Sequence, residues 1–89
     1  MTREEPKTGE VWKHFKGHYY WIKEIGHHSV TKEKMVVCVR IQDHYPKSHT
    51  IEPIALEPRI SPLKIFMLEV DHEKYPDVEQ KYRFEKVEE

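Results

Sequence analysis

The segment Met35–Gln42, with the sequence MVVCVRIQ, is the clearest β-strand of this chain. Successive side chains of a strand point to opposite faces of a sheet, so an alternating pattern assigns each residue to one face. The segment therefore divides into two faces, one formed by Met35, Val37, Val39 and Ile41 and the other by Val36, Cys38 and Arg40.

Two more strands precede this one and form a predicted hairpin. Glu10–Phe15 alternates in the same way, and His18–Ile25 is rich in the aromatic and β-branched residues that suit a pleated surface. The turn between them contains Gly17, and glycine tolerates the positive φ that short hairpin turns require. Ile25 has the opposite parity to the apolar residues before it, so a β-bulge is expected near residues 23–24.

Beyond the third strand the β-signal weakens. Pro46, Pro53 and Pro58 lack the backbone N–H that a central strand donates to its neighbour. We therefore expect a long loop at Asp43–Thr50, followed by an irregular edge segment at Ile51–Leu56.

The last third of the chain is predicted to add a helical turn and two short strands. Pro62–Phe66 favours a helical turn, because proline is well tolerated at the first helical position. Met67–Val70 and Lys81–Val87 are expected to be short closing strands, separated by residues 71–80, where another brief turn is expected.

These elements predict an all-β fold, a small and strongly curved antiparallel sheet or SH3-like barrel with one or two short helical turns. At 89 residues the chain is expected to form a single domain at residues 9–89, after a flexible charged segment at residues 1–8. Hydrophobic residues make up 37% and charged residues 35%, so the core is small. Either the stability is marginal or a second copy completes the core, and a homodimer is expected.

The charge and the single cysteine narrow the classes of function and location. A net charge of −1 argues against a general nucleic-acid binder. The charges are nevertheless unevenly spread, since residues 13–40 hold six Lys or Arg against two acids and residues 69–89 hold eight acids against four Lys or Arg. Cys38 allows no internal disulfide, and no apolar run approaches the roughly 18 residues of a membrane span, so a cytoplasmic location is expected.

A set of short motifs spread along the chain resembles a known family. They are His14-Phe15-Lys16-Gly17, Tyr20, Ile22, Ile25, His28-Ser29, Thr31, Met35-Val36-Val37, Pro62-Leu63, Phe66-Met67, Val70-Asp71, Tyr75-Pro76 and Tyr82-Arg83-Phe84. With them, the chain from Gly9 to Val87 resembles the small bacterial and phage family known as domain of unknown function 1653, apart from the segment Asp43–Glu57. The resemblance implies a compact, mainly β domain and no established activity.

The chain departs from the pattern of that family at three polar positions. The pattern has Glu after the His-Ser pair, Tyr near the end of the third strand, and Arg directly before the Pro-Leu pair. This chain has Val30, Cys38 and Ser61 there. If those positions form a pocket in the family, three of its groups are altered here.

The basic, aromatic and histidine-rich segment of residues 13–40 is the predicted binding site. Cationic side chains attract an anion, a histidine loop orients it, and an aromatic ring stacks on a planar group. Trp21 suits the stacking role, because it lies on the opposite strand face to Tyr20 and Ile22. The predicted ligand-binding residues are Lys13, Trp21, Lys23, His28, Ser29, Thr31 and Arg40.

Each of these signals has an alternative explanation. Ser29 and Thr31 can instead bond the backbone of their own turn, as such residues commonly do. His14 and His18, joined by His27 or His28, would supply three nitrogen ligands to zinc, but no metal-binding motif is present and neither metal nor cofactor is expected. A cysteine within an apolar strand is expected to be a buried apolar side chain rather than a nucleophile.

Two classes of function follow. The first is a non-catalytic binding module for a small anionic, nucleotide-like metabolite. The alternative is a protein-interaction module of phage or mobile-element origin, an inhibitor or accessory that acts through the acidic residues 69–89 or a sheet edge. No paired acid and base, nucleophile elbow or phosphate loop indicates an enzyme. An anion held at residues 13–40 is expected to bind more tightly as pH falls through about 5.5 to 7, where histidine titrates.

Overall fold

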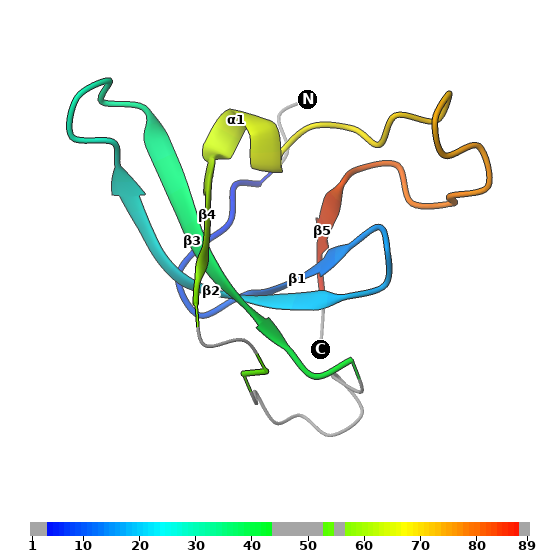
Figure 1. The fold of residues 1–89 in the computed structure, drawn as a ribbon, viewed down its shortest axis with the longest axis horizontal. Coiled ribbons are helices and arrows are strands. Elements are labelled where there is room, and N and C mark those ends of the chain that lie inside the picture. Colours follow the sequence, from blue (N-terminus) through cyan, green and yellow to red (C-terminus); the bar gives the residue numbers. More distant parts are fainter. Residues whose placement is uncertain (1–3, 44–52, 55–56, 88–89) are drawn as a thin grey trace.

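The protein is a single antiparallel sheet of five strands with one short helix, seen in a computed structural model that describes residues 4–43, 53–54 and 57–87 (Figure 1). The strand order is β4-β3-β2-β1-β5, so β4 and β5 are the two edges and the sheet is not closed. The predicted class, a small curved antiparallel sheet, is confirmed. The elements are β1 (Val11–His14), β2 (Tyr19–His27), β3 (Lys34–Ile41), β4 (Arg59–Pro62), α1 (Leu63–Phe66) and β5 (Phe84–Lys86).

The three predicted N-terminal strands are confirmed with their turn and their bulge. Gly17 has φ of 95° in the turn between β1 and β2, in the left-handed region that glycine adopts at little cost. The register between β2 and β3 shifts between Ile22 and Glu24, so the extra residue there brings Ile25 back to the parity of the core.

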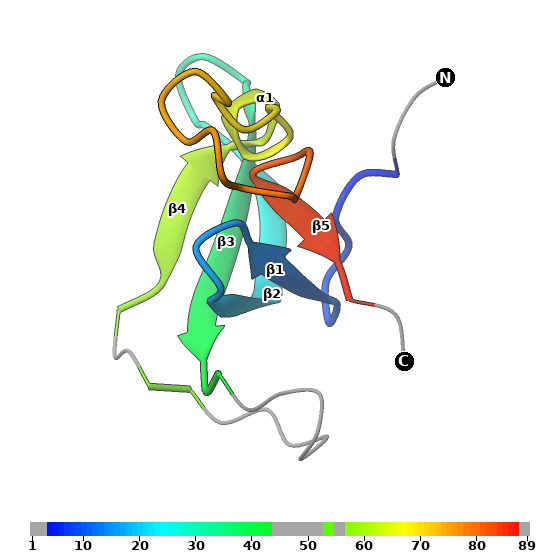
Figure 2. The same ribbon diagram turned by 90° about the vertical axis from the view of Figure 1, so that its right-hand side faces the viewer.

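The main core lies on one face of the sheet, which we call the inner face. It carries the even-numbered residues Trp12, Tyr20 and Val36, and α1 packs on it through Phe66. Figure 2 shows α1 and the chain that follows it crossing above one end of the curved strands. Val11 and Ile41 form a smaller cluster on the opposite face, where Tyr19, Trp21 and Val87 pack against them. The full inner cluster comprises Trp12, Tyr20, Ile22, Val36, Cys38, Phe66 and Phe84.

The C-terminal half differs from the sequence prediction in two elements. Met67–Val70 is not a strand, because its only sheet-like contact among the described residues is an isolated bridge from Glu69 to Tyr82. The strand β4 was not predicted, although Pro58 precedes it and Pro62 ends it. β4 is an edge strand that pairs only with β3. The missing N–H of a proline in it therefore removes no hydrogen bond to a second neighbouring strand.

The remaining predictions for this half are confirmed in part or lie outside the described residues. The helical turn is present as α1, with Pro62 just before it as the N-cap residue. The closing strand is present as β5, three residues long. The expected loop at Asp43–Thr50 and edge segment at Ile51–Leu56 lie outside the described residues except at positions 43, 53 and 54, of which Pro53 bridges to Ile41.

Candidate functional site

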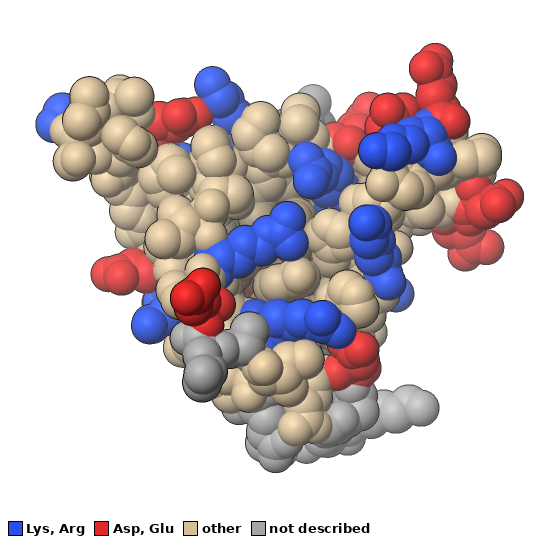
Figure 3. Space-filling view, in the orientation of Figure 1, with Lys and Arg blue, Asp and Glu red and all other residues tan. Residues whose placement is uncertain are grey.

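A cavity of about 400 Å³ opens on the inner face, where the β1–β2 turn, the start of β4 and the chain before β5 meet. Four cationic side chains and one carboxylate line it, together with aromatic rings and two histidines. Figure 3 shows Lys and Arg side chains gathered around the middle of this face. The lining residues are His14, Phe15, Lys16, His18, Tyr20, Arg59, Asp71, Lys74, Tyr75 and Arg83.

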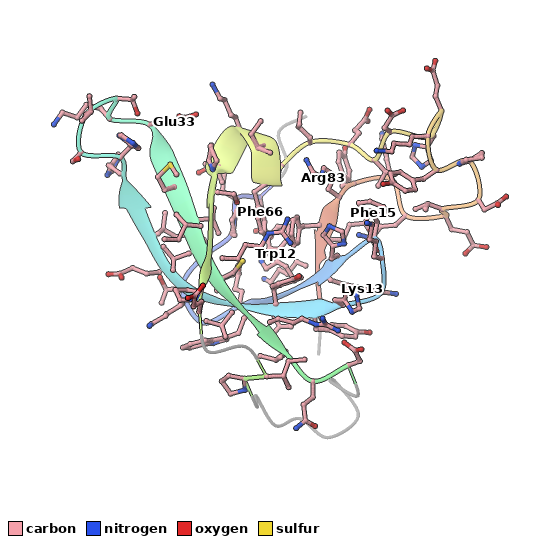
Figure 4. All side chains as sticks on the ribbon, viewed as in Figure 1. Trp12, Lys13, Phe15, Glu33, Phe66 and Arg83 are labelled. Carbon is pink, nitrogen blue, oxygen red and sulfur yellow. The ribbon has the colours of Figure 1, made fainter. Side chains whose placement is uncertain are left out.

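Specific hydrogen bonds hold the C-terminal wall of the cavity against β1. The backbone N–H of Phe15 donates to the carbonyl of Arg83 at 3.0 Å. The side-chain amide of Gln80 donates to the carbonyl of Lys13 at 3.0 Å and to that of Tyr82 at 2.9 Å. Figure 4 shows Phe15 and Arg83 side by side at this wall, next to β5. The irregular chain before β5 is thereby fixed, and Arg83 is placed beside residues of the first hairpin.

The carboxylate of Asp71 is already used by its own turn. Its Oδ1 accepts the backbone N–H groups of Glu73 at 3.1 Å and Lys74 at 3.3 Å, the pattern by which an aspartate stabilises a turn. Among the described residues, no carboxylate forms an ion pair with any of the four cations that line the cavity. The cavity therefore has an excess of positive charge, although the chain as a whole has a net charge of −1.

His14 is a buried, neutral hydrogen-bond donor at this cavity. Its side chain is 6% exposed, and its Nδ1 accepts the backbone N–H of Lys16 at 3.1 Å. Burial, and then the positive charges of Arg59, Arg83 and Lys16, lower the pKa of His14 to about 4. Because Nδ1 is an acceptor, the ring proton lies on Nε2, and a neutral ring offers an N–H donor to a ligand. At His14, protonation is therefore displaced below the range of pH 5.5 to 7 expected from the sequence.

Aromatic rings contact three of the four cationic groups without neutralising their charge. The Nζ atoms of Lys16 and Lys74 lie 5.8 and 5.5 Å from the centroid of the Tyr75 ring. That ring is 5.0 Å from the ring of Phe15. On the other side of the cavity, Arg59 lies over the ring of Tyr20 at 5.7 Å and donates to its hydroxyl at 3.3 Å. Cation–π contacts of this kind orient a charge and leave it available to an anion.

A polar network adjoins the cavity at His18. The guanidinium of Arg40 lies 2.9 Å from Nδ1 of His18, and a carboxylate oxygen of Asp43 lies 3.5 Å from the same nitrogen. A guanidinium can only donate, so the shorter contact assigns Nδ1 as an acceptor. Asp43 then pairs with Arg40 itself, at 3.6 Å. Arg40 consequently supports the cavity wall through His18.

The structure does not bring the seven sequence-predicted binding residues together. Arg40 contacts the cavity residue His18, whereas Lys13 and Lys23 are exposed and Trp21 packs in the cluster on the opposite face. None of the seven is among the residues that line the cavity.

The predicted loop residues bond their own turn. His28 Nδ1 accepts the N–H groups of Val30 at 3.1 Å and Thr31 at 3.2 Å, and Thr31 Oγ1 accepts that of Glu33 at 3.2 Å. Ser29 contributes its backbone carbonyl, which accepts from Nζ of Lys32 at 3.1 Å. The His28 ring and the Thr31 hydroxyl therefore form local hydrogen bonds within the β2–β3 connection.

None of the residues that line the cavity was predicted from the sequence to bind the ligand. His14 and His18 were considered only as metal ligands, and Arg59 lies in a strand that was not predicted. Lys74 lies in the segment of residues 69–89, whose excess of acidic residues gave no indication of an anion-binding site. The one available signal was the family resemblance, whose motifs include Tyr75 and Arg83 outside any apolar periodicity.

The positions considered for other chemistry lie apart from this cavity or within the core. Within the described ranges, no group of three or more His, Cys, Asp or Glu side chains is placed to hold a metal ion. Cys38 is fully buried, and burial raises the pKa of its thiol to about 11, so the prediction of a buried apolar side chain is confirmed. The altered family positions Val30, Cys38 and Ser61 are not among the residues that line the cavity.

The low pKa of His14 predicts a loss of stability in acid. Between pH 6.5 and about 4 the unfolded chain binds a proton at this residue and the folded chain does not, so the free energy of unfolding falls as pH falls. We expect His14 to account for about 2 to 3 kcal/mol of this loss between pH 7 and pH 4.5. Urea unfolding of the wild type and of His14→Gln at both pH values measures it, because the variant cannot titrate there. An equal loss of stability in the two proteins would contradict this assignment.

Comparisons with known proteins give one match. The family described as protein of unknown function (DUF1653) matches residues 10–86, a range that includes every strand and every residue lining the cavity. No curated protein and no solved structure shows significant similarity to the chain. In the part of the chain that the structure describes, no helix is long and apolar enough to cross a membrane. The chain belongs to the DUF1653 family.

Proposed function

We propose that this protein is a binding module for a small anionic ligand that carries a planar group, and that the ligand occupies the cavity on the inner face. One observation supports the proposal most strongly. Four cationic side chains surround a cavity of about 400 Å³, and the one carboxylate that lines it already accepts hydrogen bonds from its own turn. An excess of positive charge in a concave site raises the local concentration of anions and speeds their association.

The donors that face the cavity are of the kinds that bind oxyanions. Arg59 and Arg83 present planar guanidinium groups, which form paired hydrogen bonds with carboxylate or phosphate oxygens. Lys16 and Lys74 add mobile point charges at the rim, where both side chains are exposed. His14 adds a neutral N–H donor beneath them. A cavity of this volume lies within the range of small-molecule sites.

Amide chemical shifts test both the activity and its location. The ¹⁵N-labelled protein is titrated with inorganic phosphate and with phenyl phosphate, and amide signals of Lys16, Gly17, Tyr75 and Arg83 are expected to move most. Added sodium chloride is expected to reduce the affinity, because exposed charges are screened within about 8 Å at physiological ionic strength. Shifts confined to the hairpin at residues 28–31 would favour the sequence-predicted site instead. An absence of saturable shifts would contradict the proposed function.

The location and the self-association remain parts of the same proposal. A free thiol at Cys38, buried in the core, suits a reducing cytoplasm, where disulfides are rare. The homodimer expected from the low apolar fraction stays a prediction, which sedimentation equilibrium would test. The single domain at residues 9–89 also stays a prediction.

A further inference from the structure

We propose that the ligand is a phosphate monoester joined to a planar ring, with the phosphate held among His14, Arg59 and Arg83 and the ring against Tyr75. This inference rests on the proposed function and specifies the ligand of the same cavity. A phosphate monoester is a dianion, whereas the carboxylates, sulfate esters and phosphodiesters that a basic cavity would also attract carry a single negative charge.

The phosphate position follows from three parts of the chain that meet at one cavity. Arg59 opens β4, Arg83 precedes β5 and Lys16 lies in the β1–β2 turn, and all three line the cavity together with His14. Cations from three separate parts of the fold therefore line the same cavity as the N–H donor of His14. A tetrahedral group with three terminal oxygens can accept from several such directions at once, whereas a planar carboxylate presents only two oxygens.

The charge balance favours a dianion. Lys16, Arg59, Lys74 and Arg83 carry four positive charges at the cavity, against one carboxylate at Asp71. A phosphate monoester carries about −1.5 to −2 at pH 7, roughly twice the charge of a sulfate ester or phosphodiester. The second negative charge of the phosphate is therefore attracted by cations that have no ion-pair partner among the described residues.

The ring position follows from the aromatic wall. Phe15 and Tyr75 are half-buried, with ring centroids 5.0 Å apart, and both line the cavity. The groups over the Tyr75 ring are the ends of Lys16 and Lys74, two exposed and flexible side chains. A planar ligand can displace these ammonium groups from the ring face, and both lysines line the same cavity as the residues that hold the phosphate. Stacking of a base on an aromatic side chain contributes about 1 to 3 kcal/mol.

Titration of the protein must be separated from titration of the ligand. The groups that face the bound phosphate are His14 and Lys16 from the first hairpin and Arg59 from β4, with Arg83 before β5. His18, beside Arg40 and Asp43, and Asp71, beside Lys74, complete the charged surroundings, and Tyr20 and Tyr75 add phenol groups. Two ligands that differ only in the anion meet the same protein at each pH. The ratio of their affinities therefore isolates the second ionisation of the phosphate, near pH 6.

Calorimetric titration with three probes provides the test. Phenyl phosphate has both the dianion and the ring, phenyl sulfate keeps the ring with one charge, and methyl phosphate keeps the dianion without the ring. At pH 7.5 we expect phenyl phosphate to bind about tenfold more tightly than either of the others. Its advantage over phenyl sulfate is expected to shrink severalfold at pH 5, where the phosphate carries mainly one charge.

A variant of the aromatic wall checks the position of the ring. Tyr75→Leu is expected to weaken phenyl phosphate about tenfold and to leave methyl phosphate nearly unchanged, which also shows that the variant retains a folded cavity. Tyr82→Leu, which alters an aromatic ring outside the cavity, is the matched control and is expected to change neither affinity. Adenosine 5′-monophosphate and a 5′-phosphorylated oligonucleotide then distinguish a free nucleotide from the end of a strand.

The outcomes separate this inference from the proposed function. If all three probes bind with similar affinity and no pH-dependent ratio, the anion site stands and the phosphate monoester is excluded. If phenyl phosphate is preferred but Tyr75→Leu and Tyr82→Leu weaken it equally, the placement of the ring on Tyr75 is wrong. If none of the probes binds at millimolar concentration, both the inference and the proposed function fail.

Discussion

Replacing Arg59 and Arg83 together by methionine is expected to abolish measurable binding of phenyl phosphate. Both guanidinium groups line the cavity, and among the described residues neither is neutralised by a carboxylate. A hydrogen bond to a charged group contributes about 1.5 to 3 kcal/mol, so losing two such donors costs about 3 to 6 kcal/mol of binding free energy. That loss corresponds to a decrease in affinity of roughly a hundredfold to ten-thousandfold. Isothermal titration calorimetry at low salt measures it.

The control for this experiment is a double variant with the same change of charge elsewhere. Lys13→Met with Lys23→Met removes two exposed cations that lie outside the cavity and were predicted from the sequence to bind the ligand. We expect less than a threefold change for this protein, from long-range charge alone. The reverse ranking of the two double variants would contradict the cavity and restore the sequence-predicted site. The fold of the arginine variant should persist, because the carbonyl of Arg83 still accepts from Phe15 and β4 pairs through its backbone.

The strands that could be predicted are those whose periodicity agrees with their position in the sheet. β2 and β3 are its two longest strands and pair with each other over most of their length, so their residues alternate between the inner cluster and the opposite face. The bulge could also be predicted, because an extra residue is needed to place Ile25 on the same face of the sheet as Ile22. Here local pattern and tertiary packing favour the same structure.

β4 could not be predicted, because its sequence does not alternate between apolar and polar residues. Its sequence is RISP, flanked upstream by Pro58, and none of its four residues is buried. The strand is fixed by pairing with β3, from Cys38 opposite Arg59 to Met35 opposite Pro62. Pairing between segments so far apart in the sequence depends on the tertiary fold, so local β-propensity could not predict it.

The candidate site escaped prediction because its residues are brought together only by the fold. The sequence argument favoured residues 13–40, where charge, histidine and aromatic rings are dense along the chain. The sheet instead combines the first hairpin with Arg59 and with two cations of the acidic segment, Lys74 and Arg83. Local density of residue types is therefore a weak guide to a site whose members lie as far apart as positions 14 and 83.

Phe66 connects the helix to the core, and Phe66→Ala is expected to destabilise the protein by about 3 to 5 kcal/mol. The side chain is 1% exposed, stacks on Phe84 with ring centroids 4.1 Å apart, and meets the edge of Trp12 at 5.5 Å. It is the one buried residue of α1, and a helix of four residues has no stability of its own. Since native domains are stable by only about 5 to 15 kcal/mol, this loss is a large fraction of the total stability.

Urea unfolding followed by tryptophan fluorescence measures this loss, with Ile65→Ala as the matched control in the same helix. Ile65 is 38% exposed, so its truncation leaves no closed void and is expected to cost less than about 1 kcal/mol. Phe66→Leu keeps most of the apolar volume but loses the stacked ring, and an intermediate loss of about 1 to 2 kcal/mol is expected. Equal midpoints for Phe66→Ala and Ile65→Ala would show that α1 does not contribute to the core.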